Sequence, residues 1–127
     1  MRNTIFWAYT LLACLFTACQ DSSKLIVSDL QCEYLNAPLA IDNTTPHFGW
    51  KMTCGQNGTS SSAYQILVAT ELDKLNEEEA DLWNSGKVAS DTSLGIVYGG
   101  KALTSRTLAY WKVRVWNQND EASDWSK

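Results

Sequence analysis

The sequence predicts an all-β fold, a small antiparallel β-sandwich preceded by a signal peptide. Apolar and polar residues alternate over several short segments, turn residues recur between these segments, and long stretches with helical periodicity are missing. The 127 residues are 45% hydrophobic and 19% charged, which excludes collagen, coiled coils and low-complexity disorder. The net charge of −4 is spread along the chain, so nucleic acid is not an expected partner.

Residues 1–18 have the pattern of a lipoprotein signal peptide. Arg2 precedes an uncharged, mostly apolar run over residues 5–16. A helix over this run would reach about 18 Å, whereas the hydrocarbon core of a bilayer is about 30 Å thick. We therefore expect the run to direct secretion and not to span the membrane.

Cys19 is the predicted lipidation site. Residues 15–19 (LFTAC) resemble a bacterial lipobox, in which small residues precede the cysteine that receives the lipid. Polar residues follow Cys19, whereas cleavage at the rival Cys14 would leave two apolar residues exposed; a plain signal peptide with an incidental cysteine is the other alternative. We expect a tether over residues 19–24 and a lipid anchor that holds the protein at the bacterial cell envelope.

The predicted domain covers residues 25–127 and consists of short strands. They span residues 25–32, 47–53, 63–70, 87–89, 95–98 and 109–117. The alternation in the first strand shifts near Leu30, which indicates an irregular edge strand. Leucines and acidic residues at helical spacing over residues 72–82 predict a short surface helix or turn, and residues 84–86 predict a turn.

Large aromatic residues supply the predicted core. Trp50, Tyr64 and Trp111 are the candidates, because two sheets need large inward side chains to fill a core about 10 Å thick. A seven-stranded sandwich also needs a last strand after Ser126, and too few residues follow for one. The sequence therefore predicts a C-terminally incomplete domain with an open edge beside the strand at residues 109–117.

Several separated blocks resemble known families. Residues 64–68 (YQILV), 110–116 (YWKVRVW) and 123–126 (SDWS) resemble a fibronectin type III-like domain. More specifically, other blocks in the same order resemble the N-terminal region of bacterial α-L-rhamnosidases; they are residues 32–35 (CEYL), 38–42 (PLAID), 46–50 (PHFGW), 80–88 (ADLWNSGKV) and 90–91 (SD). The similarity covers nearly the whole expected mature chain.

The resemblance implies a structural role rather than a catalytic one. Enzymes of this family hydrolyse terminal α-L-rhamnose from glycosides with inversion, and their catalytic carboxylates stand in a large helical barrel far downstream of this region. The resemblance thus implies a non-catalytic accessory module, without catalytic residues or cofactors of its own. Its expected partners are the downstream domains of the same enzyme.

The acidic residues and the single histidine show no pattern typical of a catalytic or metal site. The acidic cluster favours a solvated surface. Glu77, Glu78, Glu79 and Asp81 crowd one short segment, where adjacent side chains point in different directions. A glycosidase instead holds two carboxyl groups across a sugar in a rigid cleft. His47 is the sole histidine and has no Cys or carboxylate at metal-ligand spacing, so no metal site is expected.

Cys32 and Cys54 remain in the expected mature chain. An oxidising compartment favours a disulfide, but antiparallel pairing of the first two strands would separate the two cysteines by about six residues, roughly 20 Å. A disulfide needs Cα atoms within about 7 Å of each other. We therefore predict that these cysteines form no disulfide and that Cys32 is buried as a small apolar residue.

Trp83 and Trp116 are the candidate carbohydrate contacts, and Trp125 and Tyr98 are further aromatic candidates. Glycan binding would need two or more coplanar exposed rings, whereas aromatic residues of a small sandwich usually fill its core or cover a contact between domains. A free-standing surface lipoprotein that binds glycans is therefore the alternative function. A remnant without function is a third.

Overall fold

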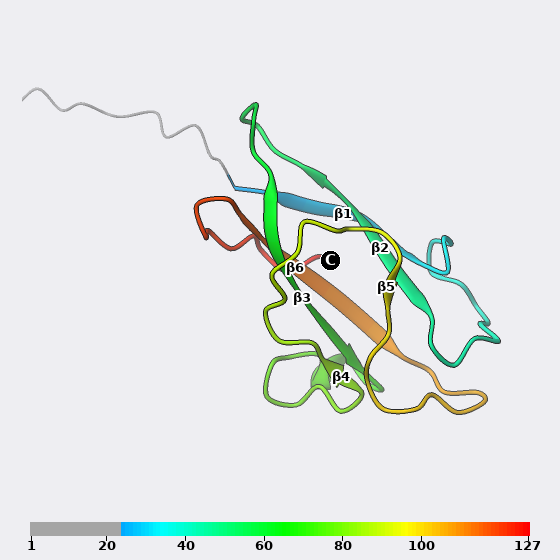
Figure 1. Ribbon diagram of the computed structural model, residues 1–127. Coiled ribbons are helices and arrows are strands. Elements are labelled where there is room, and N and C mark those ends of the chain that lie inside the picture. Colours follow the sequence, from blue (N-terminus) through cyan, green and yellow to red (C-terminus); the bar gives the residue numbers. More distant parts are fainter. Residues whose placement is uncertain (1–23) are drawn as a thin grey trace, which may run out of the picture.

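The computed structural model describes residues 24–127, which form two antiparallel sheets (Figure 1). The predicted signal peptide, residues 1–18, and the predicted lipidation site Cys19 lie outside the described residues. One sheet has the order β1-β2-β5 and contains β1 (Ile26–Cys32), β2 (His47–Thr53) and β5 (Ile96–Val97). The other has the order β4-β3-β6 and contains β3 (Ser61–Ala69), β4 (Trp83–Asn84) and β6 (Tyr110–Asn117).

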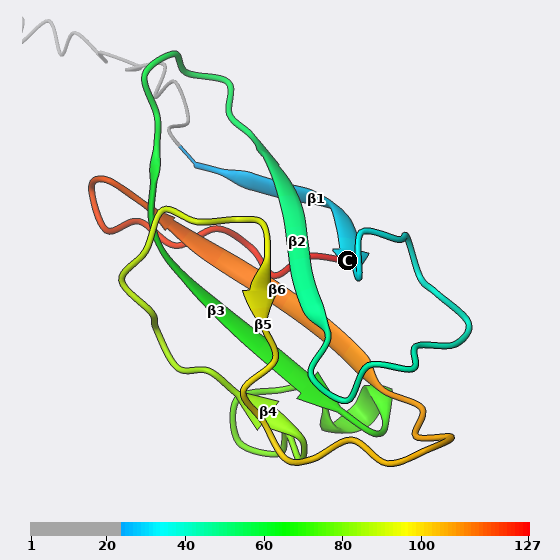
Figure 2. The same ribbon diagram turned by 45° about the vertical axis from the view of Figure 1, so that its right-hand side comes forward.

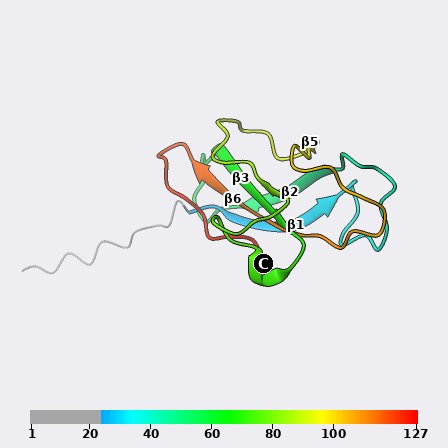
Figure 3. The same cartoon turned by 90° about the horizontal axis from the view of Figure 1, so that it is seen from below.

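One apolar core lies between the sheets, whose strands cross in the view from below (Figure 3). Its buried side chains include Phe48, Trp50, Ile66, Val68, Val113 and Val115. The predicted core residue Trp50 is only 5% exposed, while Tyr64 and Trp111 are partly buried and pack against the core. This architecture confirms the predicted all-β sandwich.

The pairing of β1 with β2 explains the state of the two cysteines. Ile26 pairs with Thr53 and Cys32 pairs with Phe48, so Cys32 and Cys54 lie at opposite ends of the pair. The two cysteines form no disulfide, as predicted, and burial raises the pKa of the Cys32 thiol to about 11. The register shifts between Ser28 and Gln31, which confirms the irregularity expected in this edge strand.

The second sheet differs from the prediction at its edge. β3 and β6 are long and pair from Ala63 opposite Trp116 to Ala69 opposite Tyr110. Residues 87–89, predicted as a strand, make only a single bridge, between Val88 and Tyr64. The predicted turn at residues 84–86 begins one residue late, because Asn84 belongs to β4 and pairs with β3.

The segment at residues 72–82 contains a short helix and a turn but no continuous helix. The 3-10 helix η1 (Leu72–Lys74) ends after one turn. Asn76 Oδ1 then accepts hydrogen bonds from the main-chain N–H groups of Glu78 and Glu79, at 3.0 and 2.9 Å. This side chain competes with a helical ladder, because it offers the backbone a local turn instead.

The edge of β6 that the sequence predicts to be open is largely occupied. After β6 the chain turns back and runs along this strand (Figures 1 and 2). The Ser123 N–H donates to the Val115 carbonyl at 2.7 Å, and the Val115 N–H donates to Ser123 Oγ at 3.0 Å. Ser126 makes the same two bonds with Val113, at 2.9 and 3.0 Å. The prediction of an open edge is therefore wrong at Val113 and Val115, because serine hydroxyls replace strand carbonyls there.

Candidate functional site

Within residues 24–127, a group of aromatic residues lies on each face of the β4-β3-β6 sheet, and Trp50 and Tyr64 form a further ring pair in the core. The inner aromatic group faces the other sheet and contains Phe48, Trp83, Tyr98 and Trp111. The Phe48 ring centroid lies 4.4 Å from that of Trp111 and 6.3 Å from that of Trp83. The rings of Trp83 and Tyr98 meet edge to face at 5.4 Å. Trp83, a predicted sugar contact, therefore packs against the core.

A close backbone approach holds the inner aromatic group together. Tyr98 is 4% exposed, and its hydroxyl donates to the Lys101 carbonyl at 2.6 Å. Burial raises the pKa of this hydroxyl above its usual value. A Cβ at Gly100 would lie 2.4 Å from the Leu82 carbonyl oxygen and 2.5 Å from Trp83 Cβ. Only glycine fits at this position, so a side chain there would displace the loop that carries Trp83.

The outer face carries a layered arrangement of cations and rings, which we call the cation–aromatic stack. Its members, in spatial order, are Lys87, Trp116, Arg114, Trp125 and Lys112. Each of the two rings is approached by two cations, at 4.6 to 4.9 Å from the ring centroid. Such contacts contribute about 0.5–1 kcal/mol each at exposed sites.

Polar partners hold the cations of the stack in place. Arg114 Nε and Nη2 donate to Gln65 Oε1 at 3.1 and 2.9 Å, and Arg114 also forms an ion pair with Glu77. Lys87 forms an ion pair with Asp120. The stack therefore connects β6 to the 77–79 turn and to the turn that follows β6.

Packing within the stack changes the environment of its members. Trp116 is only 9% exposed. Partial burial lowers the pKa of the Lys112 ammonium, and the neighbouring Arg114 charge lowers it further. Trp116 and Trp125 are aromatic candidates from the sequence, whereas the sequence assigns no such role to Lys87, Lys112 and Arg114. The signal for two of these was the alternation of cations along the outer face of β6.

The structure places the two candidate carbohydrate contacts apart. Trp83 pairs with Val68, and Trp116 pairs with Ala63. Val68 and Ala63 lie five positions apart in β3, an odd offset, so their side chains point to opposite faces of the sheet. Trp83 and Trp116 consequently do not form a coplanar exposed pair. Sugar binding by either ring alone stays a prediction.

The acidic segment at residues 77–81 makes specific contacts in addition to facing solvent. Glu77, Glu78 and Glu79 are exposed, but Glu77 pairs with Arg114. Asp81 accepts hydrogen bonds from the Thr70 N–H at 2.9 Å and from the Thr70 hydroxyl at 2.6 Å. These bonds lower the pKa of the Asp81 carboxyl. The segment therefore acts as a support for β3 and β6.

His47 belongs to a second polar cluster, between the end of β1 and the start of β2. Glu33 Oε1 accepts from the His47 main-chain N–H at 2.6 Å, lies 3.0 Å from His47 Nδ1, and accepts from Asn43 at 3.2 Å. The hydrogen bonds with His47 are the main cause of the lowered pKa of Glu33. Within residues 24–127, no group of three or more His, Cys, Asp and Glu side chains is arranged to hold a metal ion.

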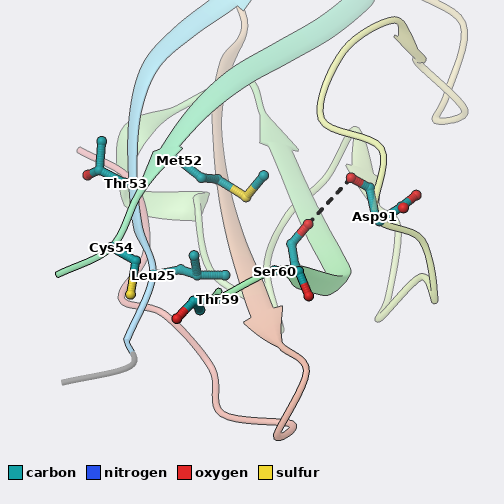
Figure 4. A pocket seen from close by; sticks show the side chains of 8 residues that line it. Leu25, Met52, Thr53, Cys54, Thr59, Ser60 and Asp91 are labelled. Atoms are coloured by element: carbon teal, nitrogen blue, oxygen red, sulfur yellow. Dashed lines mark hydrogen bonds between the residues drawn. The ribbon is translucent and has the colours of Figure 1, made fainter. Parts of the chain in front are cut away.

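A pocket of about 410 Å³ lies near the start of β1 and the end of β2 (Figure 4). It is lined by Leu25, Met52, Thr53, Cys54, Thr59, Ser60, Ser61 and Asp91. These residues include one carboxylate and no basic side chain, so the lining does not provide an acid–base pair. Separately, no helix in the described part of the chain is long and apolar enough to span a membrane.

Comparisons with known proteins agree with this geometry. Residues 27–127 match the family model described as Rha78A-like, N-terminal immunoglobulin domain. An α-L-rhamnosidase of Formosa agariphila is 43% identical over 129 residues, which cover 98% of this chain and 14% of that protein. An α-L-rhamnosidase of Streptomyces avermitilis is 40% identical over 104 residues, which cover 82% of this chain and 10% of that protein.

Solved structures show the same relationship. The crystal structure of the S. avermitilis α-L-rhamnosidase complexed with L-rhamnose matches 80% of this chain and 10% of that chain, with a TM-score of 0.76 and 40% identity. The α-L-rhamnosidase structure from Dictyoglumus thermophilum matches 85% of this chain and 12% of that chain, with a TM-score of 0.78 and 34% identity. The chain thus spans 10 to 14% of the length of these relatives. It belongs to the family of Rha78A-like N-terminal immunoglobulin domains, as the resemblance in its sequence implied.

Proposed function

We propose that this chain is a non-catalytic N-terminal accessory module of a secreted α-L-rhamnosidase-like glycoside hydrolase. One observation carries the proposal: proteins named α-L-rhamnosidase are 40 to 43% identical over 82 to 98% of this chain, yet the chain spans only 10 to 14% of their length. The parent enzyme would hydrolyse terminal α-L-rhamnose from glycosides. The module would space and brace the remainder of that enzyme.

The carboxylates of the described residues support a structural role. An inverting glycosidase needs two carboxyl groups about 6.5–9.5 Å apart on either side of the sugar. Glu33 and Asp81 accept several hydrogen bonds within the fold, and Glu77 pairs with Arg114. These groups stabilise strands and turns, and none of the three belongs to a pair that faces a sugar-sized cleft.

The proposal includes export and anchoring. The lipobox-like residues 15–19 favour lipidation of Cys19, and residues 19–24 would then form a tether to the membrane at the bacterial cell envelope. In this arrangement, the module would lie between the lipid anchor and the catalytic part of the enzyme.

The size of the native protein tests this arrangement. We expect an immunoblot of the native cells against this domain to show a band many times larger than the 14.2 kDa chain, and we expect that band to incorporate a radiolabelled fatty acid. A Cys19→Ala variant should lose the label, whereas Cys14→Ala should keep it. A labelled band near the size of this chain would contradict the accessory role.

An activity assay tests the absence of catalysis. The purified chain should release no p-nitrophenol from p-nitrophenyl α-L-rhamnoside, while the full-length Streptomyces avermitilis relative serves as the positive control. Removing the corresponding domain from that relative should lower its thermal stability and leave the kcat of the surviving folded enzyme within about twofold, because only structural contacts are lost. Turnover by the purified chain would overturn the proposal.

A further inference from the structure

The turn between β2 and β3 contains an asparagine followed directly by a glycine. Residues 54–60 join the two strands, and this segment projects from one end of the sandwich (Figures 1 and 2). Asn57 and Gly58 form the turn, and both are exposed. Gly58 has a φ of 78°, in the left-handed region that glycine adopts without strain. The dipeptide is therefore in contact with water in the folded protein.

The groups of this dipeptide that could react with each other are not held by hydrogen bonds. Among the described residues, neither the side-chain amide of Asn57 nor the main-chain N–H of Gly58 has a hydrogen-bond partner. Gly58 also carries no side chain that would shield its nitrogen. The nitrogen of Gly58 can therefore approach Cγ of Asn57 with little steric hindrance.

The other asparagines in the sequence lack this combination. Asn57 is the only one followed by glycine. Asn84 is exposed, but its Oδ1 accepts a hydrogen bond from the Gly86 N–H at 2.9 Å, which fixes the side chain. Asn36 is exposed and its side chain has no hydrogen-bond partner among residues 24–127, but Ala37 follows it and carries a Cβ beside the nitrogen. Asn36 is thus a natural control for the effect of the glycine.

We propose that Asn57 is a site of spontaneous deamidation, which converts it to aspartate and isoaspartate with water as the only co-reactant. The Gly58 nitrogen gives its proton to solvent and attacks Cγ of Asn57. The new N–Cγ bond closes a cyclic imide while the Cγ–Nδ2 bond breaks, and the side-chain nitrogen takes up a proton and leaves as ammonia.

Water then opens the cyclic imide at one of its two carbonyl carbons. Attack at Cγ breaks the new bond to the Gly58 nitrogen and leaves an ordinary aspartate. Attack at the main-chain carbonyl carbon breaks the original peptide bond, so the chain then runs through the former side chain as isoaspartate. Either product replaces a neutral amide with a carboxylate in a chain whose net charge is −4.

The reaction would loosen the contact between this turn and the segment after β6. Gln118 Nε2 donates to the Gly58 carbonyl at 3.3 Å, and Gln118 Oε1 accepts from the Ser60 N–H at 3.0 Å. The Gln118 N–H also donates to the Ser60 carbonyl, at 3.1 Å. Isoaspartate lengthens the main chain by one bond directly before Gly58, which displaces the carbonyl that Gln118 binds. This inference does not depend on the proposed enzymatic parent.

Incubating the purified chain in warm, mildly alkaline buffer tests the proposal. Peptide mass spectrometry follows the conversion of each asparagine, and an isoaspartyl methyltransferase with S-adenosylmethionine measures the isoaspartate. We expect Asn57 to convert at least about tenfold faster than Asn36, because a Cβ on the following residue hinders attack by its nitrogen. Isoaspartate should form at Asn57. Equal conversion rates at the two asparagines would overturn the proposal.

Two glycine variants of the same turn form a matched pair. Gly58→Ala keeps Asn57 but places a methyl group beside the attacking nitrogen, so conversion should slow by about tenfold. Gly55→Ala should leave the rate unchanged, because a Cβ there has no neighbour within 4 Å and Gly55 has no positive φ. The assignment would be wrong if Gly58→Ala converted as fast as Gly55→Ala.

Hydrogen exchange tests the consequence for the turn. The isoaspartate form, separated from the original chain by anion exchange, should exchange the Ser60 amide faster, because this amide donates to Gln118 in the unmodified protein. The Val113 amide, which is buried in β6, should exchange at the same rate in both forms. Unchanged exchange at Ser60 would refute the loosening of the turn.

Discussion

The two faces of the β4-β3-β6 sheet use the same residue type in different ways. On the inner face, Trp83 and Trp111 pack against Phe48 beside the apolar core. On the outer face, Trp116 and Trp125 are layered between lysine and arginine side chains. The difference teaches that the number of tryptophans alone does not locate a binding site. A tryptophan ring can already be packed in the core or layered against neighbouring lysine and arginine side chains.

The faces also differ in how they are stabilised. The inner aromatic group gains from the removal of large apolar surface from water, which costs several kcal/mol to undo. The stack gains from contacts of about 0.5–1 kcal/mol each, which depend on the polar partners that hold the cations. We therefore expect substitutions on the two faces to differ in size, and the following predictions test this order.

The largest effect is expected at Phe48 in the inner aromatic group. This side chain is 4% exposed and contacts the rings of Trp83, Tyr98 and Trp111. Phe48→Ala should lower the free energy of unfolding by about 3–5 kcal/mol, because it leaves a cavity among these rings. Urea unfolding measures the loss, and Phe48→Leu, which fills most of the space, should lose less. A smaller loss at Phe48→Ala than at Trp125→Ala would break the comparison.

An intermediate effect is expected at Ser126, which forms hydrogen bonds with β6, the strand that carries Trp111 on one face and Trp116 on the other. Ser126→Ala removes the hydroxyl that accepts from the Val113 N–H, and Val113 is fully buried. The free energy of unfolding should fall by about 1–3 kcal/mol, because a buried donor loses its partner. Ser126→Thr keeps the hydroxyl and should lose less. Faster exchange of the Val113 amide in the alanine variant alone would support this assignment; unchanged exchange would refute it.

A smaller effect is expected at Trp125 in the stack. Trp125→Ala removes a ring that contacts both Lys112 and Arg114, so the free energy of unfolding should fall by about 1–2 kcal/mol. Trp125→Phe retains a ring and should recover part of the loss. The comparison would fail if the two variants were equally destabilised and the Arg114 side-chain resonances were the same in both.

The smallest effect on stability is expected from acid. Lowering the pH protonates carboxylates beside the sheet and leaves the aromatic rings unchanged. Hydrogen bonds from Thr70 lower the pKa of Asp81 below its usual 3.8. The unfolded state then binds the proton more readily, so this stabilisation is present above about pH 4 and is lost as the pH falls through the lowered pKa. Asp81→Asn should lower Tm at pH 7 and flatten the decline of Tm below about pH 4.

Circular dichroism melting curves between pH 7 and pH 2.5 measure this effect. The matched control is Asp42→Asn, because Asp42 is exposed and its carboxylate has no hydrogen-bond partner among the described residues. This control should follow the original chain throughout. A parallel decline for Asp81→Asn and the original chain would refute the assigned role of Asp81.

Much of the fold could be predicted from local pattern. β2 has the predicted bounds, and β6 begins one residue later than predicted. Period-two alternation identified these strands, and it also placed Trp50 in the core. Residues 72–82 were harder, because the side chain of Asn76 binds the main chain nearby and the side chain of Asp81 reaches β3. The helical spacing of the leucines gives no information about these side-chain hydrogen bonds.

The sites were less predictable than the strands. Lys87 reaches Trp116 from another segment, and Trp125 meets Arg114 only because the chain turns back along β6. The same reversal places Ser123 and Ser126 on the strand edge. These contacts join residues that lie apart in the sequence, so they depend on pairing and register and not on local periodicity.

By itself, the sequence determined the all-β class, the strands with regular alternation, the separation of Cys32 from Cys54 and the family resemblance, because each follows from local pattern or from the order of motifs. Only the tertiary structure decided which tryptophans enter the core, which are layered with cations, and how the edge of β6 is closed. The physical reason is that alternation assigns a side chain to a face, whereas the partner on that face is chosen by strands and turns brought together from distant parts of the chain.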